Sequence, residues 1–338
     1  MSASTAVVIL NYNGRALLEK FLPSVVAFSS PARVIVADNA STDDSLPWLE
    51  KNYPQVERIA MDQNRGFCGG YNTALKMVKA DRYVLLNSDV EVTPGWLVPL
   101  EEVLDQYPDV AAVQPKVLAE RQRDHFEYAG AAGGLLDTLG YPFCRGRIFY
   151  HTEKDEGQYD DERAIFWSSG ACMMIRSAWF HRLGGLDEDF FAHMEEIDLC
   201  WRLQRAGQKV YYTHRSQVFH VGGATLQASN PRKTYYNFRN GLSLIYSNLP
   251  AGELVFKFPI RLALDWVASF KFMLAGTVRD GLAVLRAHAH FFRNFKREVN
   301  RRRRSAELGY TRPATQYSGW VVWDFFILGK RKAADVVD

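Results

Sequence analysis

Two aspartates in this sequence follow apolar runs at points where a carboxylate could hold a ligand. Asp38 ends the run "RVIVAD", and a carboxylate there can accept the imide hydrogen of a pyrimidine base. Asp89 lies in "VLLNSDVEV" (84–92), where it offers a hard divalent cation an oxygen ligand beside a diphosphate. A single aspartate at a strand end is more often an ordinary solvent-facing residue, so each position needs support from its neighbours.

A second acidic group lies in "FFAHMEEIDLCWRLQRAG" (190–207). Glu195, Glu196 and Asp198 fall in the first turn of a predicted helix, where the helix dipole favours negative charge. This structural explanation is sufficient alone, but a carboxylate with acidic neighbours can also act as the general base for a substrate hydroxyl. His220, at the end of a predicted strand, is either an ordinary surface or core histidine or a residue that completes a metal site.

A parallel sheet would bring the strand-end residues together. Strands are predicted over residues 5–10, 33–41, 56–61 and 82–89, and helices over residues 15–27, 70–79 and 94–107. This alternation is typical of an α/β fold with a mostly parallel, Rossmann-like sheet flanked by helices. Ligands bind beyond the carboxyl ends of the strands in such folds, so residues 11–13, 38–41 and 87–89 are expected at one edge of the sheet.

The middle of the chain is less regular. Residues 121–163 are rich in Gly, Asp, Glu and Arg, and they are predicted to form a long loop. The segment 164–177 is predicted as one strand with a Gly-Ala break. A helix over 195–206, closed by Gly207, and a further strand are predicted to follow.

Charge divides the chain into two parts. Residues 1–230 contain 22 Lys and Arg against 30 Asp and Glu, a net charge of −8, whereas residues 231–338 contain 19 against 8, a net charge of +11. An acidic α/β domain over 1–230 and a basic, aromatic helical region over 231–338 are therefore predicted. The run Arg301–Arg304 could suit nucleic acid, but no nucleic-acid-binding module accompanies it, so nucleic acid is not an expected partner.

The basic region has the composition of a helix that lies on a membrane surface. Residues 254–285 are strongly apolar but interrupted by charged residues, and without an apolar run of 18 residues no transmembrane span is expected. Cationic residues interleaved with Phe, Trp and Leu suit the membrane interface, and the basic run over 293–304 would add attraction to anionic lipid. The alternative is a helical subdomain that packs on the α/β domain and has a solvated basic face.

Composition and cysteine spacing indicate a globular, reduced protein. The chain has 338 residues, 47% of them hydrophobic and 23% charged, which suits one large domain with an appendage or two modest domains. Its four cysteines, Cys68, Cys144, Cys172 and Cys200, form no C-x-x-C pair, and no signal peptide precedes them. A cytoplasmic protein with structural thiols is therefore expected, and a zinc site is not.

Five motifs in a fixed order give the sequence a specific resemblance. In chain order they are "VVILNYNG", "VIVADNASTDDS", "NRGFCGGYN", "LLNSDVEVTPGWL" and "FFAHMEEIDLCWRLQRAG". Over roughly residues 5–240 the chain resembles the family 2 glycosyltransferases, especially their bacterial rhamnosyltransferase-like branch. The resemblance implies the GT-A fold of nucleotide-diphospho-sugar transferases, a divalent metal such as Mg²⁺ or Mn²⁺, and inversion at the anomeric carbon.

The resemblance also implies which residues bind the donor. The residues that would hold the nucleoside are Leu10, Asn11, Tyr12, Asn13 and Asp38, with Asn39 nearby. The residues that would contact the base or the diphosphate are Asn64, Arg65 and Gly66, and Asn72 would face the same cleft. The triplet Asn87, Ser88 and Asp89 falls where the family has its D-x-D metal motif, and Asp89 matches the metal-binding aspartate.

Catalytic roles follow from the same resemblance. Glu195-Glu196 matches the acidic pair of the family, usually Glu-Asp, whose second member is the base, so Glu196 is the expected base and Glu195 the substitute. His220 resembles the histidine that completes the metal shell in related galactofuranosyl and rhamnosyl enzymes. Trp201 and Arg202 follow the family pattern, but they are expected to pack or to orient the helix.

Two departures from the family pattern bear on these roles. Asn87 replaces the first aspartate of the metal motif, which removes one formal negative charge and predicts weaker metal binding rather than none. Glu196 replaces the usual aspartate, so the expected base lies one methylene further from the backbone. The longer side chain requires only a compensating position of the acceptor.

The expected reaction is a single displacement on a nucleotide-activated sugar. The branch resemblance favours dTDP-rhamnose as donor and a glycan or polyprenyl-linked glycan of the bacterial envelope as acceptor; a UDP-sugar carrying galactofuranose, glucose or N-acetylglucosamine is the alternative donor. A nucleotidyltransferase would need a G-x-G-T-R-type loop after the first strand, which "NYNGRALLEKF" lacks. A non-catalytic glycan- or membrane-binding protein is the remaining alternative, favoured by Asn87 alone. The enzyme is expected in the cytoplasm, peripheral on the inner face of the cell membrane.

Overall fold

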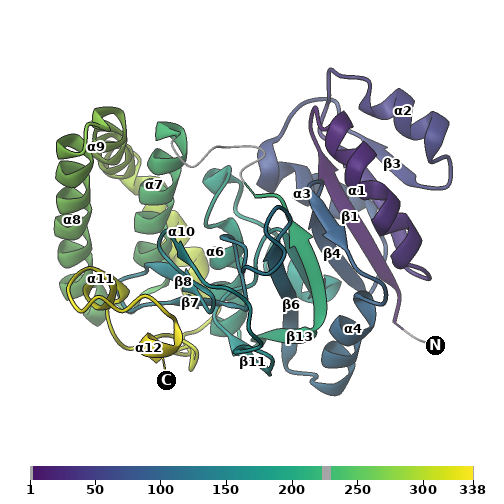
Figure 1. Ribbon diagram of the computed structural model, residues 1–338. Coiled ribbons are helices and arrows are strands. Elements are labelled where there is room, and N and C mark those ends of the chain that lie inside the picture. The colour runs from purple at the N-terminus through teal and green to yellow at the C-terminus, as the bar shows by residue number, and fades with distance from the viewer. Residues whose placement is uncertain (1–2, 223–229, 338) are drawn as a thin grey trace.

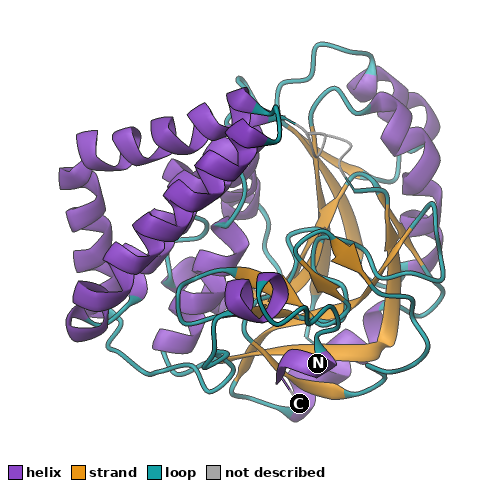
Figure 2. Ribbon diagram, turned by 60° about the vertical axis from the view of Figure 1, so that its left-hand side comes forward, coloured by secondary structure: helices purple, strands orange, loops and turns teal. Residues whose placement is uncertain are grey.

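The structure is an α/β sheet domain with a group of C-terminal helices beside it. The computed structural model describes residues 3–222 and 230–337. Figure 1 shows the twisted central sheet with helices against it, and the C-terminal helices gathered at one side. In the turned view of Figure 2 the same helices again form a separate group next to the strands.

The N-terminal part alternates strand and helix, as the sequence predicts. Its elements are β1 (Thr5–Asn11), α1 (Arg15–Phe28), β2 (Arg33–Asp38), α2 (Ser45–Asn52), β3 (Glu57–Ala60), α3 (Gly66–Met77), β4 (Arg82–Asn87), β5 (Val90–Val92) and α4 (Leu97–Gln106). Strand β1 pairs in parallel with β2 and with β4, and β2 pairs in parallel with β3. Asn11 lies opposite Asp38, and Leu10 lies opposite Asn87, so the three strand ends meet at one edge of the sheet.

Helix α3 begins earlier than predicted. It starts at Gly66 rather than near residue 70. The side-chain oxygen of Asn64 accepts the backbone N–H of Gly66 at 2.8 Å, which satisfies one of the free donors at the beginning of a helix. The "NRGF" loop is therefore shorter than the sequence suggests, and its last residues belong to the helix.

The second half of the sheet is mixed. Its strands are β6 (Val110–Ala119), β11 (Glu162–Ile165), β12 (Cys172–Arg176) and β13 (Lys209–His220). Strand β12 runs antiparallel to both β4 and β6, whereas β13 runs parallel to β6 and antiparallel to β11. Among the described residues the order across the sheet is β11-β13-β6-β12-β4-β1-β2-β3, with β5 paired to β13. The α/β fold class is confirmed, with the parallel pairing concentrated in the N-terminal half.

The prediction of one strand over 164–177 is wrong. The segment contributes to β11 and β12, which are separated in the sheet by β13 and β6. Between the two strands Trp167 and Gly134 exchange backbone hydrogen bonds of 3.0 and 3.2 Å, so the chain leaves the central sheet there. Strand β6, which carries Pro115 within it, is not among the predicted strands.

The predicted long loop over 121–163 contains a second sheet, so this prediction is also wrong in part. Its antiparallel strands are β7 (Gly134–Leu136), β8 (Pro142–Cys144), β9 (Arg147–Ile148) and β10 (His151–Thr152). Leu135, Phe143 and Ile148 of this sheet pack against Val321 and Phe325. Strands of two or three residues carry no readable alternation, and their apolar partners come from a distant part of the chain.

Two apolar clusters cover the two faces of the central sheet. Alternate residues of β1 point to opposite faces, so Val8 belongs to one cluster and Val7 to the other. Trp201 lies in the first cluster and Trp96 in the second, and both are almost completely buried. All four cysteines are buried and free, which agrees with structural thiols.

The remaining elements are helical, in agreement with the predicted C-terminal region. They are α5 (Ser177–Arg182), the 3-10 helix η1 (Glu188–Phe190), α6 (Glu195–Arg205), α7 (Pro231–Asn248), α8 (Ala251–Leu274), α9 (Val278–Arg293), α10 (Phe295–Glu307), α11 (Val321–Phe326) and α12 (Ala334–Val337). Helix α6 matches the helix predicted over 195–206. Of the helices in residues 3–222 and 230–337, none combines the length and apolar character required to cross a membrane.

Candidate active site

Asp38 is oriented by two hydrogen bonds at the end of β2. The side-chain N–H of Asn11 donates to Asp38 Oδ2 at 2.9 Å, and the backbone N–H of Ser41 donates to Asp38 Oδ1 at 2.8 Å. Asp38 and Asn11 are both fully buried, whereas Tyr12 is half exposed beside them. The strand ends therefore hold the carboxylate in one orientation, and its contact with a base stays a prediction.

The turn after β1 is joined to the turn after β2. Asn13 has a positive φ of 49°, and its Oδ1 accepts the backbone N–H of Thr42 at 2.7 Å. Its own N–H donates to Ser41 Oγ at 2.9 Å. Leu10 packs closely on α3, since a Cβ added at Gly70 would lie 2.8 Å from its Cδ1. The segment from Leu10 to Asn13 is thus held between β2 and α3.

Asn39 links the end of β2 to the loop before α3. Its Nδ2 donates to Gly66 O at 2.9 Å and to Asn64 Oδ1 at 3.1 Å, while its Oδ1 accepts the N–H of Arg65 at 2.9 Å. Gly66 has a φ of 68°, and a Cβ there would lie 3.0 Å from the ring of Phe191. Glycine is favoured here, because L side chains rarely adopt this backbone conformation and an added Cβ would crowd the ring.

Asn72 contacts the segment that leads to the acidic pair. Its Nδ2 donates to Leu186 O at 2.8 Å and to Glu188 Oε1 at 3.1 Å, and its Oδ1 accepts the N–H of Leu186 at 2.9 Å. The side chain is buried. These bonds tie α3 to the chain before Glu195, and the predicted place of Asn72 in a donor cleft stays a prediction.

Asp89 and His220 lie side by side, and Glu127 completes the group. His220 Nε2 is 3.2 Å from Asp89 Oδ1, and His220 Nδ1 is 3.3 Å from Glu127 Oε2. All three side chains are buried. Pairing of β13 with β5, which sets His220 opposite Val90, brings the histidine to the strand end that carries Asp89.

Glu127 is the residue of this group that sequence reasoning missed. It lies in the segment predicted as a loop, and its backbone N–H donates to Val117 O of β6 at 3.1 Å. Gly222 must remain small beside it, because an added Cβ would lie 2.4 Å from Glu127 Oε1. No local pattern marks Glu127, because its neighbours are brought together only by the pairing of β6 with β13.

The electrostatics of this group suit a divalent cation. Burial alone lowers the pKa of His220, but the carboxylates of Glu127 and Asp89 outweigh it and raise the pKa to about 10. For a cation, Asp89 offers an oxygen, and His220 offers Nε2 once the cation displaces its proton. Glu127 lies 3.3 Å from Nδ1 on the other side of the ring, where carboxylates behind metal-bound histidines are found. In the described part of the chain, no group of three or more His, Cys, Asp or Glu side chains is arranged to hold a metal ion by itself. Phosphate oxygens of the substrate and water molecules would therefore complete the coordination of the cation.

The acidic pair lies next to the strand end that carries Asn87. Glu195 is buried and Glu196 keeps partial solvent contact; within the described residues Oε2 of each has no hydrogen-bond partner. A Cβ added at Gly170 would be 3.9 Å from Glu196 Cδ. The next residue, Ala171, accepts the backbone N–H of Asn87 at 2.9 Å. The structure therefore brings Glu195 and Glu196 to the edge of the sheet at which β4 ends with Asn87.

Both carboxyl groups of the pair have raised pKa values. Loss of hydration raises the pKa of Glu196 to about 7. Burial also raises the pKa of Glu195 well above the usual carboxyl range, and the charge of Glu196 adds to this effect. Glu196 therefore titrates near neutral pH, and the charged form of Glu195 is disfavoured beside it. A carboxylate with a pKa near 7 is well matched to accept a proton at neutral pH.

Two neighbours on α6 support the helix, as predicted for them. Trp201 is buried in the core. Arg202 donates to Leu183 O and to Gly185 O, both at 2.9 Å, and its Nε pairs with Asp198 Oδ2 at 2.7 Å. These contacts fix the angle at which α6 leaves the preceding loop.

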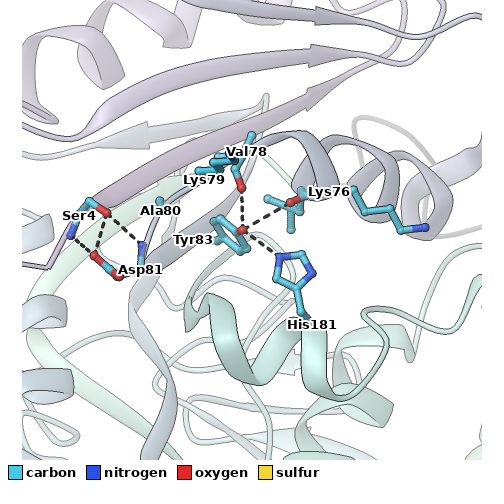
Figure 3. Close-up of a pocket in the computed structure, with 9 residues that line it drawn as sticks. Ser4, Lys76, Val78, Lys79, Ala80, Asp81, Tyr83 and His181 are labelled. Atoms are coloured by element: carbon cyan, nitrogen blue, oxygen red, sulfur yellow. Dashed lines mark hydrogen bonds between the residues drawn. The ribbon is translucent and has the colours of Figure 1, made fainter.

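An open depression of about 500 Å³ lies elsewhere on the molecule (Figure 3). Its lining includes Ser4, Asp81, Tyr83 and His181, and the Tyr83 hydroxyl is 2.9 Å from His181 Nε2. Ser4 and Asp81 immediately precede β1 and β4, so the depression lies at the amino ends of these strands. The candidate site is at the opposite, carboxyl ends, and the depression contributes nothing to it.

Solved structures with the same architecture are glycosyltransferases. The mannosyltransferase PcManGT from Pyrobaculum calidifontis, solved with GDP-Man and Mn²⁺, matches with a TM-score of 0.53 at 15% identity, over 91% of this chain and 87% of that chain. GalNAc-T7, solved with UDP, GalNAc and Mn²⁺, matches with a TM-score of 0.56 at 15% identity, over 72% of this chain and 48% of that chain. These likenesses show that the fold is GT-A.

Sequence comparison identifies the family and its related proteins. The family model described as glycosyl transferase family 2 matches residues 6–184. Rhamnosyltransferase WbbL of Escherichia coli K12 is 35% identical over 223 residues, which are 63% of this chain and 82% of that protein. The N-acetylglucosaminyl-diphospho-decaprenol L-rhamnosyltransferase of Mycobacterium tuberculosis H37Rv is 29% identical over 233 residues, 63% of this chain and 75% of that protein.

The fold and the family match together define a glycosyltransferase with a GT-A architecture. The chain belongs to glycosyl transferase family 2, and its relatives place it in the rhamnosyltransferase-like branch of that family.

Proposed function

We propose that the protein transfers rhamnose from dTDP-rhamnose to a glycan or polyprenyl-linked glycan of the bacterial envelope, with inversion. The observation that carries the proposal is Glu196: its raised pKa, an Oε2 without a hydrogen-bond partner in the described part of the chain, and its position beside the Asn87 strand end suit a general base. Rhamnose is favoured because the relatives from E. coli and M. tuberculosis are both named rhamnosyltransferases. A UDP-sugar remains the alternative donor.

In the proposed reaction Glu196 accepts the proton of the acceptor hydroxyl while that oxygen bonds to the anomeric carbon. The bond from the anomeric carbon to the diphosphate oxygen breaks on the opposite face of the sugar, and its electron pair leaves with the nucleoside diphosphate. The raised pKa of Glu195 favours its neutral form, which limits the negative charge beside Glu196. Proton transfer to a positioned base contributes about 10²- to 10⁴-fold to such rates.

We assign the donor to the strand-end residues described above. The nucleoside would contact Asp38 and the segment Leu10–Asn13, and the diphosphate would lie near Asn64–Gly66 and Asp89. Asp89 and His220 would hold Mg²⁺ or Mn²⁺, and Glu127 would orient the imidazole. When bound, the cation supplies positive charge against the charge that develops on the leaving diphosphate.

A panel of nucleotide sugars tests the donor by thermal unfolding. With Mn²⁺ present, dTDP-rhamnose is expected to raise the Tm more than UDP-galactofuranose, UDP-glucose or UDP-N-acetylglucosamine, because the donor that binds most tightly stabilises the fold most. A ligand at 100 times its Kd stabilises the fold by about 2.7 kcal/mol. The nucleotide alone, free rhamnose and EDTA serve as controls. A larger shift with a UDP-sugar would select the alternative donor. No shift and no donor hydrolysis with any sugar would leave only a non-catalytic binding protein.

Asn87→Asp is expected to raise the affinity of the site for the metal ion. It restores the charge that Asn87 lacks relative to the family motif, and carboxylate count sets the affinity of such sites. The Mn²⁺ concentration for half-maximal transfer should fall by about tenfold. The matched control is Asn52→Asp at the end of α2, because the exposed Asn52 side chain donates to Trp48 O of its own helix. An unchanged metal requirement in Asn87→Asp would remove Asn87 from the cation site.

Helix α8 has its polar residues inside and its apolar residues outside. Its buried residues are Arg261, Asp265 and Ser269. Arg261 Nε pairs with Asp265 Oδ1 at 2.9 Å, and His288 Nε2 of α9 is 3.2 Å from Asp265 Oδ2. The large apolar side chains of α8 that are between 57% and 73% exposed are Val255, Phe256, Trp266, Val267, Phe270 and Leu274. A helix with this orientation exposes a surface that water does not favour.

We propose that this outward face of α8 lies on an anionic membrane. Exposed arginines alternate with exposed apolar residues on the neighbouring helix α9, where Arg279, Arg286 and Arg293 are spaced seven residues apart. The net charge of +11 over residues 231–338 complements anionic lipid. In this proposal the region 231–338 brings the α/β domain 1–230 to the inner face of the cell membrane, where a polyprenyl-linked acceptor is found.

Vesicle binding tests the membrane surface. The full chain is expected to sediment with vesicles of equal parts phosphatidylglycerol and phosphatidylcholine at low salt, and Trp266→Ser with Phe270→Ser should weaken this binding by about tenfold or more. Met77→Ser with Tyr150→Ser removes comparably exposed apolar side chains outside the region and is the matched control. If the wild-type chain does not bind the vesicles, the proposal is contradicted. If the wild-type chain is a dimer in solution and Trp266→Ser with Phe270→Ser dissociates it, the exposed face of α8 binds a second copy of the chain instead.

A further inference from the structure

The chain immediately before the acidic pair has a strained backbone. Phe191, His193 and Met194 all have positive φ values, 65°, 68° and 72°, although none is a glycine. Met194 is the residue that precedes the first turn of α6, so its conformation sets the direction in which Glu195 and Glu196 leave the loop. Non-glycine residues keep such conformations only where the surrounding structure holds them.

Helix α7 holds this segment by its backbone. Asn240 is buried, and its Nδ2 donates to the carbonyl oxygens of Phe190 (3.1 Å), Ala192 (2.9 Å) and His193 (2.6 Å). The neighbouring Arg239 donates through Nη2 to Asp189 O at 2.8 Å and to Phe190 O at 2.7 Å. Two adjacent side chains of one helix therefore bind four carbonyl groups over residues 189–193.

The orientation of the Asn240 amide is itself fixed. Its Oδ1 accepts the Nε–H of Arg239 at 2.7 Å, so its NH₂ group must face the loop. Both hydrogens of that group are needed for the three carbonyl oxygens. An oxygen in place of the NH₂ group would face the same carbonyls without a hydrogen to share.

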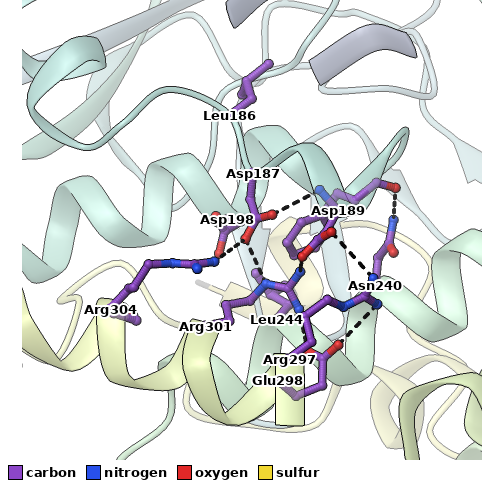
Figure 4. Close-up of polar contacts among 12 residues, drawn as sticks. Leu186, Asp187, Asp189, Asp198, Asn240, Leu244, Arg297, Glu298, Arg301 and Arg304 are labelled. Carbon is purple, nitrogen blue, oxygen red and sulfur yellow. Dashed lines mark hydrogen bonds and ion pairs between the residues drawn. The ribbon is translucent and has the colours of Figure 1, made fainter. Parts of the chain in front are cut away.

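Helix α10 holds the acidic side chains at the start of the same segment. Arg301 donates through Nε to Asp187 Oδ2 at 2.8 Å and through Nη2 to Asp189 Oδ2 at 3.2 Å. Glu298 is completely buried, and its carboxylate pairs with Arg301 and, at 3.4 Å, with Arg297. Figure 4 shows the arginine side chains of α10 meeting Asp187 and Asp189, with Asn240 of α7 beside them.

The geometry points to Asn240 as a positioning residue for the general base: it holds the segment Phe190–Met194 so that Glu196 keeps its orientation toward the acceptor hydroxyl. This inference rests on the proposed function of Glu196. It makes the C-terminal helices part of the active site, because Asn240 and Arg301 belong to the region beyond residue 230. Asn240 itself touches neither donor nor acceptor in this role.

Asn240→Asp tests the inference with almost no change of volume. The variant is expected to lower kcat for sugar transfer by about 10- to 100-fold, while the Kd of the nucleotide sugar stays within about twofold of wild type. In a Glu196→Gln background, Asn240→Asp should lower kcat only slightly further, because its effect acts through the base. Asn237→Asp is the matched control, because in the described residues Asn237 makes no side-chain hydrogen bond to this segment.

Two outcomes would overturn the inference. One is a folded Asn240→Asp variant with wild-type kcat, and the other is an equal loss in the wild-type and Glu196→Gln backgrounds, which indicates a general structural role. If Asn240→Asp does not fold at the assay temperature, Arg239→Lys replaces it in the same cycle, since Lys cannot bind two carbonyls through one planar group.

Amide hydrogen exchange separates this inference from the proposed function. Asn240→Asp, but not Asn237→Asp, is expected to raise exchange of the peptide over residues 187–197 by about tenfold or more, whether or not an acceptor is found. A wild-type protein that transfers no sugar while the peptide responds in this way would overturn only the proposed reaction. Unchanged exchange in the variant would overturn the positioning role.

Discussion

Glu196→Gln is expected to lower the turnover of sugar transfer by about 10²- to 10⁴-fold while leaving donor binding intact. The amide keeps the size of the side chain but cannot accept the proton of the acceptor hydroxyl. Because the carboxylate of Glu196 is costly to bury, as its pKa of about 7 indicates, the variant should unfold no more easily than wild type at pH 8. Single-turnover transfer and calorimetric titration with the nucleotide sugar measure the two effects.

The pH dependence of the wild-type enzyme follows from the same residue. A base with a raised pKa is protonated and inactive below that value, so kcat/KM should rise about tenfold per pH unit up to about pH 7 and then level off. This rise should be lost in Glu196→Gln. Folding has the opposite dependence: the raised pKa favours the protonated folded form, so stability from this group falls as the pH rises between the ordinary carboxyl value and about 7.

Two comparisons make the test of Glu196 decisive. Glu307→Gln changes an exposed carboxylate of α10 and should leave transfer unchanged. Glu195→Gln replaces a carboxyl group whose charged form is disfavoured by burial and by the charge of Glu196, so its effect should be smaller than that of Glu196→Gln. Near-normal turnover in Glu196→Gln, or a larger loss in Glu195→Gln, would move the role of base away from Glu196.

The second large effect is expected from Asp89→Asn. This change removes the carboxylate that would bind the cation, and transfer should fall by roughly 100-fold or more, since even the groups behind metal ligands are worth about 10- to 100-fold. Raising the Mn²⁺ concentration should recover part of the loss. Initial rates over a Mn²⁺ series, with EDTA as the zero point, measure both the loss and the recovery.

Glu127→Gln provides the graded comparison for this site. Glu127 contacts His220 rather than the cation, so its loss should be the smaller one, about 10- to 100-fold. Glu91→Gln, a partly exposed position on β5 outside the group, is the control. Equal activity of Asp89→Asn and wild type at every Mn²⁺ concentration would show that catalysis does not depend on a cation at Asp89.

The N-terminal half of the fold and the strand-end residues can be predicted from the sequence because their signals are local. Apolar runs of β1, β2 and β4 end in polar residues, and parallel pairing must bring such ends together. Asp89 and His220 meet as expected for a shared site, although they are distant in sequence. The position of the acidic pair predicts the first turn of a helix, and the helix begins at Glu195.

The rest depends on contacts that no local pattern encodes. Glu127 reaches His220 only because β6 pairs with β13, and β6 itself is not among the predicted strands. Asn240 lies in a helix whose sequence gives no indication that it binds the loop over 189–193. Composition predicts that the basic residues of the C-terminal region mainly contact a membrane. Arg301 is instead buried in ion pairs with Asp187 and Glu298.

The small sheet over residues 134–152 has a consequence for the order of synthesis. Its apolar residues pack on Val321 and Phe325, and the backbone N–H of Ala333 donates to Glu153 at 3.0 Å. A ribosome makes these partners well after residues 134–152, so the middle segment emerges before it can finish packing. Because Glu127 lies close before this sheet in the chain, the candidate site should be completed only after translation has passed residue 333.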